Sequence, residues 1–306
     1  MTKFWEAMGG KLADRWATMG SPALVYWMGG LAAYAYSTKD VARVGNWIAH
    51  QPAVTQMSVV LLTLAVVGTS AIVVNRLVPA ALTMIQGPWR GPLTRLSAWS
   101  GNRIARRAAA WAAQWQLLAP IVDAGHSTAA QRAEYARLDA RLRQLPTSDV
   151  GYLPTSVGNA LLATSSIVAD KYGLDSASTW PRLWLVLPQS TRDDLTAARA
   201  SLDASVAAIV WSLAFCAFAP LTAWVIPVGV ALAAAAMWLW VPSRVKTFTA
   251  LVESAYDLYR FLLYSQLKLK PPAKAADEPQ AGRQLTAYLF RGFSSPGIEF
   301  AEEKSQ

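Results

Sequence analysis

A single uncharged run, Ala204–Val241, constrains the fold of this chain more than any other feature of its sequence. One spanning helix needs about 20 apolar residues to cross a hydrocarbon core of about 30 Å, so the run is long enough for two crossings. Pro220 and Pro227 interrupt it, and a proline within hydrocarbon leaves a backbone carbonyl without a partner. The sequence therefore predicts a hairpin of two short spans, at about 204–221 and 223–241.

Two further apolar segments predict a first hairpin. Residues 22–38 are aromatic, and Gly29 and Gly30 would let another helix approach closely. A short polar loop follows, and a cleaner span runs from about 53 to 74, with a helical pattern that continues toward Gln86. Four spans in two hairpins predict an all-α integral membrane protein, as 54% hydrophobic and only 15% charged residues also indicate.

The boundaries of these segments predict the domain organisation. We expect an amphipathic N-terminal helix at 1–20, transmembrane hairpin 1 at 21–86, a helical cytosolic domain at 87–203, transmembrane hairpin 2 at 204–242, a cytosolic helix at 243–270, and a linker, short helix and tail at 271–306. Lys and Arg are concentrated at the N-terminus, after the second span and after the fourth. The positive-inside rule then places both termini and the central domain in the cytoplasm.

The central domain contains local helix signals. Residues 128–145 have an amphipathic pattern that Pro146 ends. Thr155 is a candidate N-cap, and Thr191 is another, with two aspartates in the turn that follows it. We expect the helix beginning at Thr191 to lead directly into the third span.

Tryptophans and arginines alternate where the central domain begins. Such a pattern has two interpretations: aromatic and basic side chains that clamp nucleic acid, or a juxtamembrane helix that places aromatics at the interface and arginines on lipid phosphate. The adjacent membrane exit favours anionic lipid headgroups over nucleic acid. The net charge of +9 is likewise better explained by Lys and Arg gathered at the cytoplasmic ends of the spans than by a nucleic-acid surface. The candidate interface residues are Arg90, Arg95, Arg103, Arg106, Arg107, Trp89 and Trp99.

Patterns that would indicate catalysis or metal binding are scarce. Cys216 is the single cysteine, and the two histidines lack acidic or cysteine neighbours at ligand spacing. His126 and Asp123 could join a serine in a hydrolase, but no nucleophile elbow accompanies them. We therefore expect no enzyme, cofactor or metal. The predicted spans contain no Asp, Glu, Lys or Arg, which argues against a proton relay but leaves room for an uncharged pore.

Three segments carry a resemblance. They contain Leu153-Pro154-Thr155 with Gly158-Asn159, Tyr172-Gly173-Leu174-Asp175 and Trp180-Pro181-Arg182-Leu183-Trp184 within 152–188, then YDLYRFLLYSQLKLKPP at 256–272 and LTAYLFRG at 285–292. Together they resemble a family of uncharacterised bacterial inner-membrane proteins with four spans. The resemblance implies that Asn159, Tyr172, Asp175, Trp180 and Arg182 form one polar and aromatic cluster. That cluster is either a ligand site or a structural one, in which Asp175 pairs with Arg182 or caps a helix.

Three functions are consistent with these features. The first is a homo-oligomeric channel or membrane effector, whose copies assemble through the small-residue faces of the spans and whose cytosolic domain receives a partner or ligand. Its layout is similar to that of pentameric bestrophin-like anion channels, although none of their motifs is visible. The second is a passive anchor or scaffold for a soluble cytosolic partner. The third is a membrane-bound hydrolase that would use His126 or Asp123.

Overall fold

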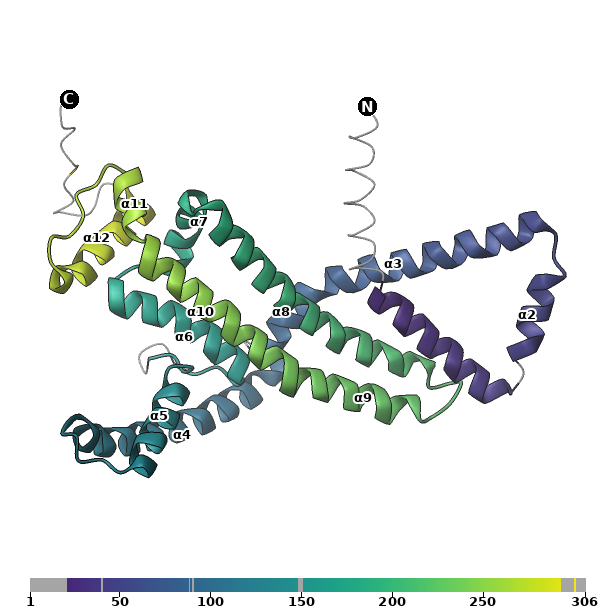
Figure 1. The fold of residues 1–306 in the computed structure, drawn as a ribbon, viewed down its shortest axis with the longest axis horizontal. Helices are drawn as coiled ribbons and strands as arrows, with labels where there is room; N and C mark the ends of the chain where they lie inside the picture. Colours follow the sequence, from purple (N-terminus) through teal and green to yellow (C-terminus); the bar gives the residue numbers. More distant parts are fainter. Residues whose placement is uncertain are drawn as a thin grey trace. The chain divides into compact units, whose positions relative to one another are not determined.

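The computed structural model describes residues 21–39, 41–87, 89, 91–147, 151–292 and 300. These residues are helical almost throughout, and their only β-structure is an isolated bridge between Leu269 and Phe300. The prediction of an all-α chain is therefore confirmed (Figure 1). After a helix at 21–38, the helices are α2 (Val41–Ala49), α3 (Ala53–Gln86), α4 (Thr94–Asp123), α5 (Ala129–Leu142), α6 (Ser156–Tyr172), α7 (Ser176–Val186), α8 (Gln189–Phe215), α9 (Val225–Ala235), α10 (Val241–Tyr259), α11 (Phe261–Gln266) and α12 (Glu278–Arg291).

Contacts between residues divide the chain into two units. The apolar unit comprises Met1–Leu82 and Asp203–Val241, and the polar unit comprises Thr83–Leu202 and Pro242–Gln306. Helices α3 and α8 each contribute residues to both units, and α10 begins at the boundary between them.

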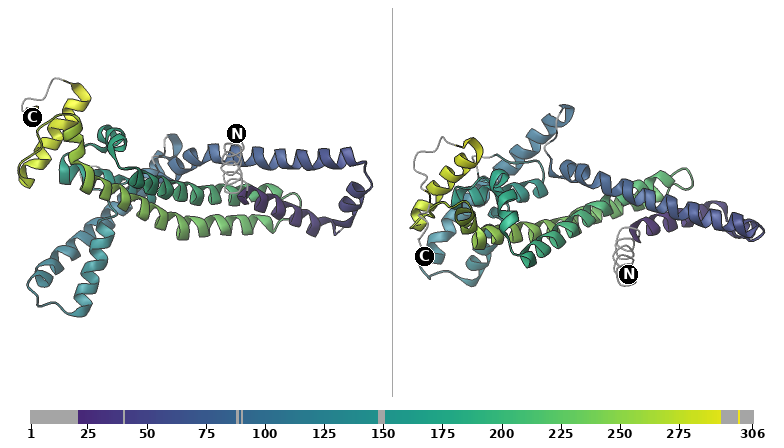
Figure 2. Two further views of the ribbon diagram at one scale, coloured as in Figure 1. Left: turned by 45° about the horizontal axis from the view of Figure 1, so that its top comes forward. Right: turned by 90° about the horizontal axis from the view of Figure 1, so that it is seen from above.

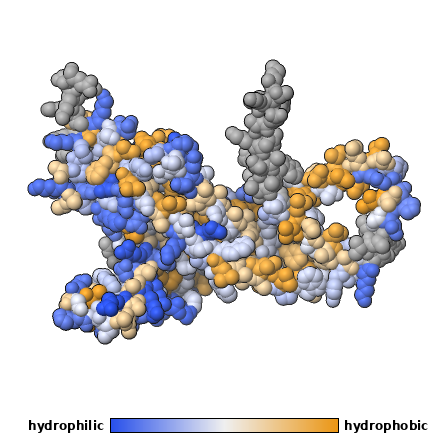
Figure 3. All heavy atoms as spheres, in the orientation of Figure 1, coloured by the Kyte–Doolittle hydropathy of each residue, from blue (hydrophilic) through white to orange (hydrophobic). Residues whose placement is uncertain are grey.

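Three helical segments are long and apolar enough to cross a membrane. They are Ala53–Asp123, whose first helix is α3, Gln189–Phe218 and Val225–Tyr259. Only 17%, 22% and 28% of their most apolar windows are buried within the chain, and hydrophobic side chains are widely exposed on these helices (Figure 3). The helix at 21–38 is not among the three, so the four-span arrangement stays a prediction.

Small residues bring the helices of the apolar unit together. A Cβ added at Gly29 would collide with the ring of Phe215, and one at Gly30 with the ring of Phe218, so the glycines leave room for these two rings. In the same unit Trp27 donates its indole N–H to Ser70 Oγ at 3.1 Å. The glycines that the sequence suggested for assembly between copies are therefore occupied within one chain.

The second hairpin is held by a stripe of small residues on α9. Val225, Gly229, Ala233 and Ala236 are buried, and a Cβ at Gly229 would lie 2.6 Å from the carbonyl oxygen of Ser212 on α8. The turn lies at 219–224, between a 3-10 segment (Cys216–Phe218) and α9. A π-helical segment, Ala236–Trp240, then joins α9 to α10.

Four local expectations differ from the structure. Helix α2 occupies the segment expected to be a polar loop, and α8 begins at Gln189, so Thr191 lies inside the helix and is not its N-cap. Pro227 lies in the first turn of α9, where a missing N–H is tolerated, rather than in the hairpin tip. Helix α12 begins at Glu278, within the expected linker. The amphipathic helix expected at 1–20 lies outside the described residues.

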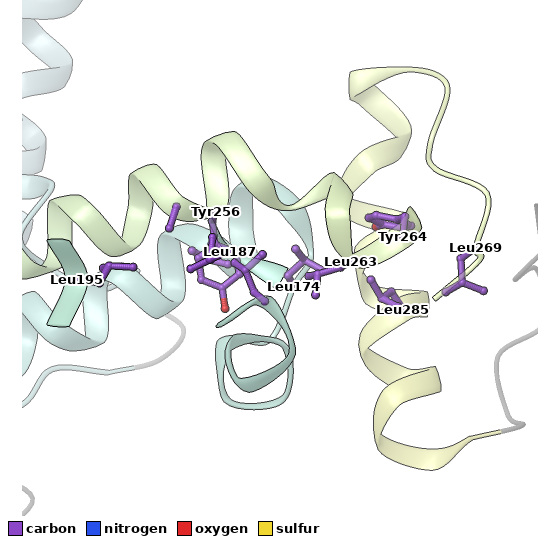
Figure 4. Close-up of a cluster of buried hydrophobic side chains, with 11 residues drawn as sticks. Leu174, Leu187, Leu195, Tyr256, Leu263, Tyr264, Leu269 and Leu285 are labelled. Carbon is purple, nitrogen blue, oxygen red and sulfur yellow. The ribbon is translucent and has the colours of Figure 1, made fainter. Parts of the chain in front are cut away.

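The polar unit has a core built from six helices, α6, α7, α8, α10, α11 and α12, and the segments between them (Figure 4). Tyr256 of α10 is fully buried at its centre, and its hydroxyl lies 3.0 Å from Thr179 Oγ1 of α7. Because the Thr179 hydroxyl donates to the carbonyl of Asp175 at 2.7 Å, Tyr256 is the donor in that pair. The other core side chains are Val168, Leu174, Leu183, Leu187, Leu195, Ala255, Leu263, Tyr264, Leu269 and Leu285.

Helices α4 and α5 form an antiparallel pair within the polar unit (Figure 2). Trp115 stacks on Tyr135 with ring centroids 5.5 Å apart, and the guanidinium of Arg141 lies over the ring of Trp111 at 5.2 Å. Thr128 and the Gln131 side chain form a reciprocal capping box at the start of α5. The amphipathic helix predicted at 128–145 is thus present, with Leu138 as its buried residue.

Candidate functional site

The two ends of α6 carry the densest polar contacts of the polar unit. At the N-terminal end is a segment that we call the α3–α6 joint, formed by Gln86, Gly87, Leu153, Pro154, Thr155, Gly158 and Asn159. Thr155 is the N-cap of α6, as the sequence predicted, and accepts a hydrogen bond from Gly158 N. Its hydroxyl also donates to the carbonyl of Gln86, the last residue of α3, at 2.9 Å. One side chain therefore caps α6 and satisfies a carbonyl at the end of α3.

Asn159 organises the backbone of the same joint. It is fully buried, its Oδ1 accepts from Leu153 N at 2.8 Å, and its Nδ2 donates to the carbonyls of Leu153 and Thr155, both at 2.7 Å. Both amide hydrogens are thus used, which fixes the side chain in one orientation. An apolar side chain of similar size could not replace these bonds.

Glycine is required at two positions of the joint. A Cβ at Gly158 would collide with the carbonyl oxygen of Gln86, and a Cβ at Gly87 would collide with the ring of Pro154. Gly87 also has φ of +92°, a conformation that L side chains rarely adopt. Ser100 of α4 adds a hydrogen bond to the carbonyl of Pro154 at 2.8 Å. The backbones of α3 and α6 therefore meet at this point with no room for a side chain at Gly158, and a side chain of α4 bonds the segment beside them.

At the C-terminal end of α6, charged residues connect it to α10 and α12. Lys171 Nζ lies 2.7 Å from Glu253 Oε1, and the Tyr172 hydroxyl donates to the Asp257 carboxylate. Arg260, which follows α10, pairs with Glu278 at the start of α12. We call this group the α6–α10–α12 network.

Arg260 is the central residue of the network. Its guanidinium lies 4.3 Å from the ring centroid of Tyr172 and 4.5 Å from that of Phe261, which is stacking geometry for a cation. The side chains of Arg260 and Glu278 are only 15% and 9% exposed. Burial lowers the pKa of Arg260, but the hydrogen bond and charge of Glu278 outweigh it and raise the pKa above its usual value. The pair is therefore a charged pair held away from water.

The same surroundings raise the pKa of Tyr172. Burial, followed by the hydrogen bond to Asp257 and the negative charge of that carboxylate, raises the pKa of Tyr172 to about 12. The phenol therefore stays protonated and keeps its role as a hydrogen-bond donor at neutral pH.

Two glycines let α6 and α12 cross in direct backbone contact. A Cβ at Gly173 would collide with the carbonyl oxygen of Pro279, and a Cβ at Gly282 would collide with that of Tyr172. Gly173 ends α6 in the left-handed conformation, with φ of +67°. Thr286 of α12 accepts from Asp175 N at 3.1 Å. The C-terminal helix is therefore held by shape and by polar contacts.

The five residues expected to form one cluster have different positions. Tyr172 belongs to the network, whereas Asn159 lies thirteen residues earlier on α6, which corresponds to about 20 Å along the helix. Asp175 caps α7 by accepting from Ala177 N and Ser178 N. Trp180 packs on Tyr256 at 5.8 Å, and the exposed Arg182 donates to the carbonyl of Ser178 at 2.5 Å. The structure does not bring the five together.

The candidate lipid residues also divide into groups. The Trp89 indole donates to the carbonyl of Met84 at 2.8 Å, near the end of α3. Arg103 lies over the exposed ring of Trp99 at 5.6 Å. Arg95, Arg106 and Arg107 are exposed on α4, and Arg90 lies outside the described residues.

Sequence reasoning missed most of the network. Glu253, Asp257 and Arg260 lie on one helical stretch at spacings of four and three, a signal for one shared face that could have been used. Glu278 carries no such signal, because it sits in a segment rich in alanine, proline and charge that is typical of a linker.

No cluster of metal ligands accompanies these contacts in the described part of the chain. Within it, no three His, Cys, Asp or Glu side chains gather closely enough to hold a metal ion. His126 and Asp123 are exposed at the turn between α4 and α5. The polar contacts at the two ends of α6 join it to α3, α4, α10 and α12.

Comparison with known proteins adds no relative, because no family model, curated protein or solved structure matches the chain. The resemblance to bacterial four-span membrane proteins stays a prediction.

Proposed function

We propose that this chain is a non-enzymatic multi-pass membrane protein that acts as an oligomeric effector or channel, controlled through its polar unit. The apolar surface of α3 is the observation that supports this most. One stripe of α3 is buried within the apolar unit and consists of Val67, Ala71, Val74 and Val78. Most other large apolar side chains of α3 are exposed. A patch of this size needs lipid or protein to cover it. The exposed side chains include Val54, Met57, Val60, Leu61, Leu62, Leu64, Ile72 and Val73.

The exposed side of α3 also suits contact between copies. Gly29 and Gly30 are already covered by phenylalanines of the same chain, so assembly falls to other helices. Ala65 and Thr69 are exposed four residues apart on α3, and small residues at that spacing let two helices pack closely in lipid. Ser58 and Thr63 donate to their own helix carbonyls and so tolerate an apolar environment.

Control through the polar unit is supported by the two ends of α6. The α3–α6 joint holds the end of α3, and the α6–α10–α12 network holds the end of α10. Both α3 and α10 belong to segments apolar enough to span a membrane. A ligand or partner that shifts α6 would therefore act on two such helices at once.

The charge distribution supports one orientation for this membrane protein. We place it in the bacterial inner membrane with both termini and the polar unit in the cytoplasm, because basic residues follow α3 and the hairpin, whereas the hairpin tip has none. A green fluorescent protein fused after Gln306 should fluoresce, whereas alkaline phosphatase at the same position should be inactive. The reverse result would contradict this orientation.

The first test is the mass of the detergent-solubilised chain by light scattering, with the detergent contribution subtracted. We expect a discrete multimer that Ala65→Leu together with Thr69→Leu reduces in size, while Leu77→Ala outside that pair leaves it unchanged. Conductance in liposomes would then separate a channel from an effector without a pore. A monomer for the unchanged chain would contradict assembly.

A scaffold for a soluble partner is the second candidate. Large apolar side chains are exposed on the polar unit, notably Leu185 on α7, Leu258 on α10 and Phe290 on α12, and such residues are typical of protein-binding surfaces. A monomer that retains one purified cytosolic protein, and loses it on Phe290→Ser, would favour this function over the first.

A further inference from the structure

The outer face of α4 is exposed in the described part of the polar unit. Helix α5 covers the side of α4 that carries Ala108, Trp111 and Trp115. The opposite side presents, at helical spacings, Leu96, Trp99, Arg103, Arg106, Leu117 and Ile121, all of them exposed. Trp99 and Leu117 are 58% and 72% exposed, and with Leu96 and Ile121 they place several exposed large apolar side chains on one helical face, as at lipid or protein contact sites.

The charge of this face is of one sign. The sequence has no acidic residue between Asp40 and Asp123, and no carboxylate pairs with Arg103 or Arg106 among the described residues. The guanidinium of Arg103 lies over Trp99, so that the cation and the aromatic ring point into the same surroundings. Basic groups mixed with tryptophan and leucine on one helical face are typical of an interfacial membrane helix.

Chain connectivity keeps α4 near a membrane exit. The α3–α6 joint is also bonded to the first turns of α4, because Ser97 Oγ donates to the carbonyl of Gly87 at 3.4 Å and Ser100 bonds Pro154. From Arg76 to Gln86, α3 rises about 15 Å. Helix α4, with 30 residues, is about 45 Å long. Its outer face is therefore long enough to return to the headgroup layer from the end of α3.

We propose that the outer face of α4 lies in the headgroup layer and binds anionic lipid through Arg103 and Arg106, with Trp99, Leu96, Leu117 and Ile121 inserted beside them. This inference rests on the proposed membrane setting and adds a lipid dependence to it. Because α4 is bonded to the joint, lipid composition would act directly on the ends of α3 and α6.

A single probe tests the contact in the full chain. Cys216→Ser removes the native thiol, and Ala110→Cys places an environment-sensitive fluorophore at the centre of the outer face, while Ala133→Cys on the exposed side of α5 is the matched control. The labelled chains are reconstituted in nanodiscs of phosphatidylcholine, with or without phosphatidylglycerol. We expect a blue shift and quenching by brominated lipid for position 110 in the anionic discs, and neither for position 133.

Charge variants then identify the lipid-binding groups. An arginine near an anionic surface contributes about a fivefold factor, so Arg103→Gln with Arg106→Gln should lower the ratio of docked to undocked α4 about 30-fold. Arg137→Gln on α5, combined with Arg143→Gln at its C-cap, should leave that ratio unchanged. A probe at position 110 that stays aqueous in both discs, or that responds only when an acidic peptide or RNA is added, would overturn the proposal. Retention in the bilayer after alkaline carbonate extraction is measured in parallel, because its loss would refute the membrane setting itself.

Discussion

Replacing Asn159 by alanine tests whether the α3–α6 joint depends on this side chain. The substitution removes three hydrogen bonds and leaves the N–H and C=O of Leu153 without the partner that the structure gives them. The carbonyl of Thr155 still accepts from Asn159 N in the helix. A buried backbone group left unsatisfied costs about 1–3 kcal/mol, so two half-buried groups predict a loss of about 3 kcal/mol. For a unit of this size, that corresponds to a melting temperature lower by roughly 6–12 °C.

Thermal melting of the detergent-solubilised chain, followed by tryptophan fluorescence, measures this loss. Asn102→Ala is the matched control, because Asn102 is exposed on α4 and alanine is the better helix former. Asn159→Asp sharpens the test, since its carboxylate can accept from Leu153 N but would face the carbonyls of Leu153 and Thr155. We expect this variant to be destabilised at pH 7 and to recover as acid protonates the carboxylate. If Asn159→Ala melts within about 3 °C of the parent chain, the joint does not depend on these bonds.

Three further predictions concern the other end of α6. Gly282→Ala forces α12 away from the Tyr172 carbonyl and should lower the free energy of unfolding by about 1–3 kcal/mol. The loss should be seen as a lower melting temperature and faster proteolysis of α12. The control Gly45→Ala lies in open space on α2 and should change neither. Glu278→Gln removes the charge that pairs with the largely buried Arg260 and should lower the free energy of unfolding by about 3 kcal/mol. Asp139→Asn, whose pair with Arg143 is exposed, should lower it by less than about 1 kcal/mol. Equal melting of the two variants would contradict the burial argument. The pKa of Tyr172 is raised from 10.0 to about 12 in the folded state. The stability that the Tyr172 phenol contributes is therefore complete below pH 10 and is lost as pH rises toward 12. A titration followed by phenolate absorbance should show one fewer tyrosine ionising at high pH in Tyr172→Phe.

Local patterns predicted much of the fold correctly. The hairpin within Ala204–Val241, the long extension of α3 to Gln86 and the cap at Thr155 each follow from a few neighbouring residues, and the structure contains all three. Errors occurred where a local signal was weak or misleading. The segment of α2 was expected to be a polar loop and the start of α12 a linker, yet both are helical. At α12 the close approach of Gly282 to the Tyr172 carbonyl shows tertiary contact of the kind that overrides propensity.

The candidate site shows more clearly what sequence patterns could not predict. The sequence placed Asn159, Tyr172 and Asp175 in one motif-rich stretch, but a helix separates the first from the second by several turns. The partners of Tyr172 and Arg260 come from α10 and α12, and nothing in the spacing of the motifs indicates which of these helices meet.

The sequence by itself determined that the described chain is helical, where its uncharged segments lie and that Thr155 caps α6, because each of these properties depends on residues within a few turns of one another. Only the tertiary structure decided that Gly158 and Gly282 are backbone crossing points, that Arg260 and Glu278 form a pair shielded from water, and that large apolar side chains on one face of α4 are exposed. Burial and close approach depend on which surfaces meet in space, and that is a property of the whole packed chain.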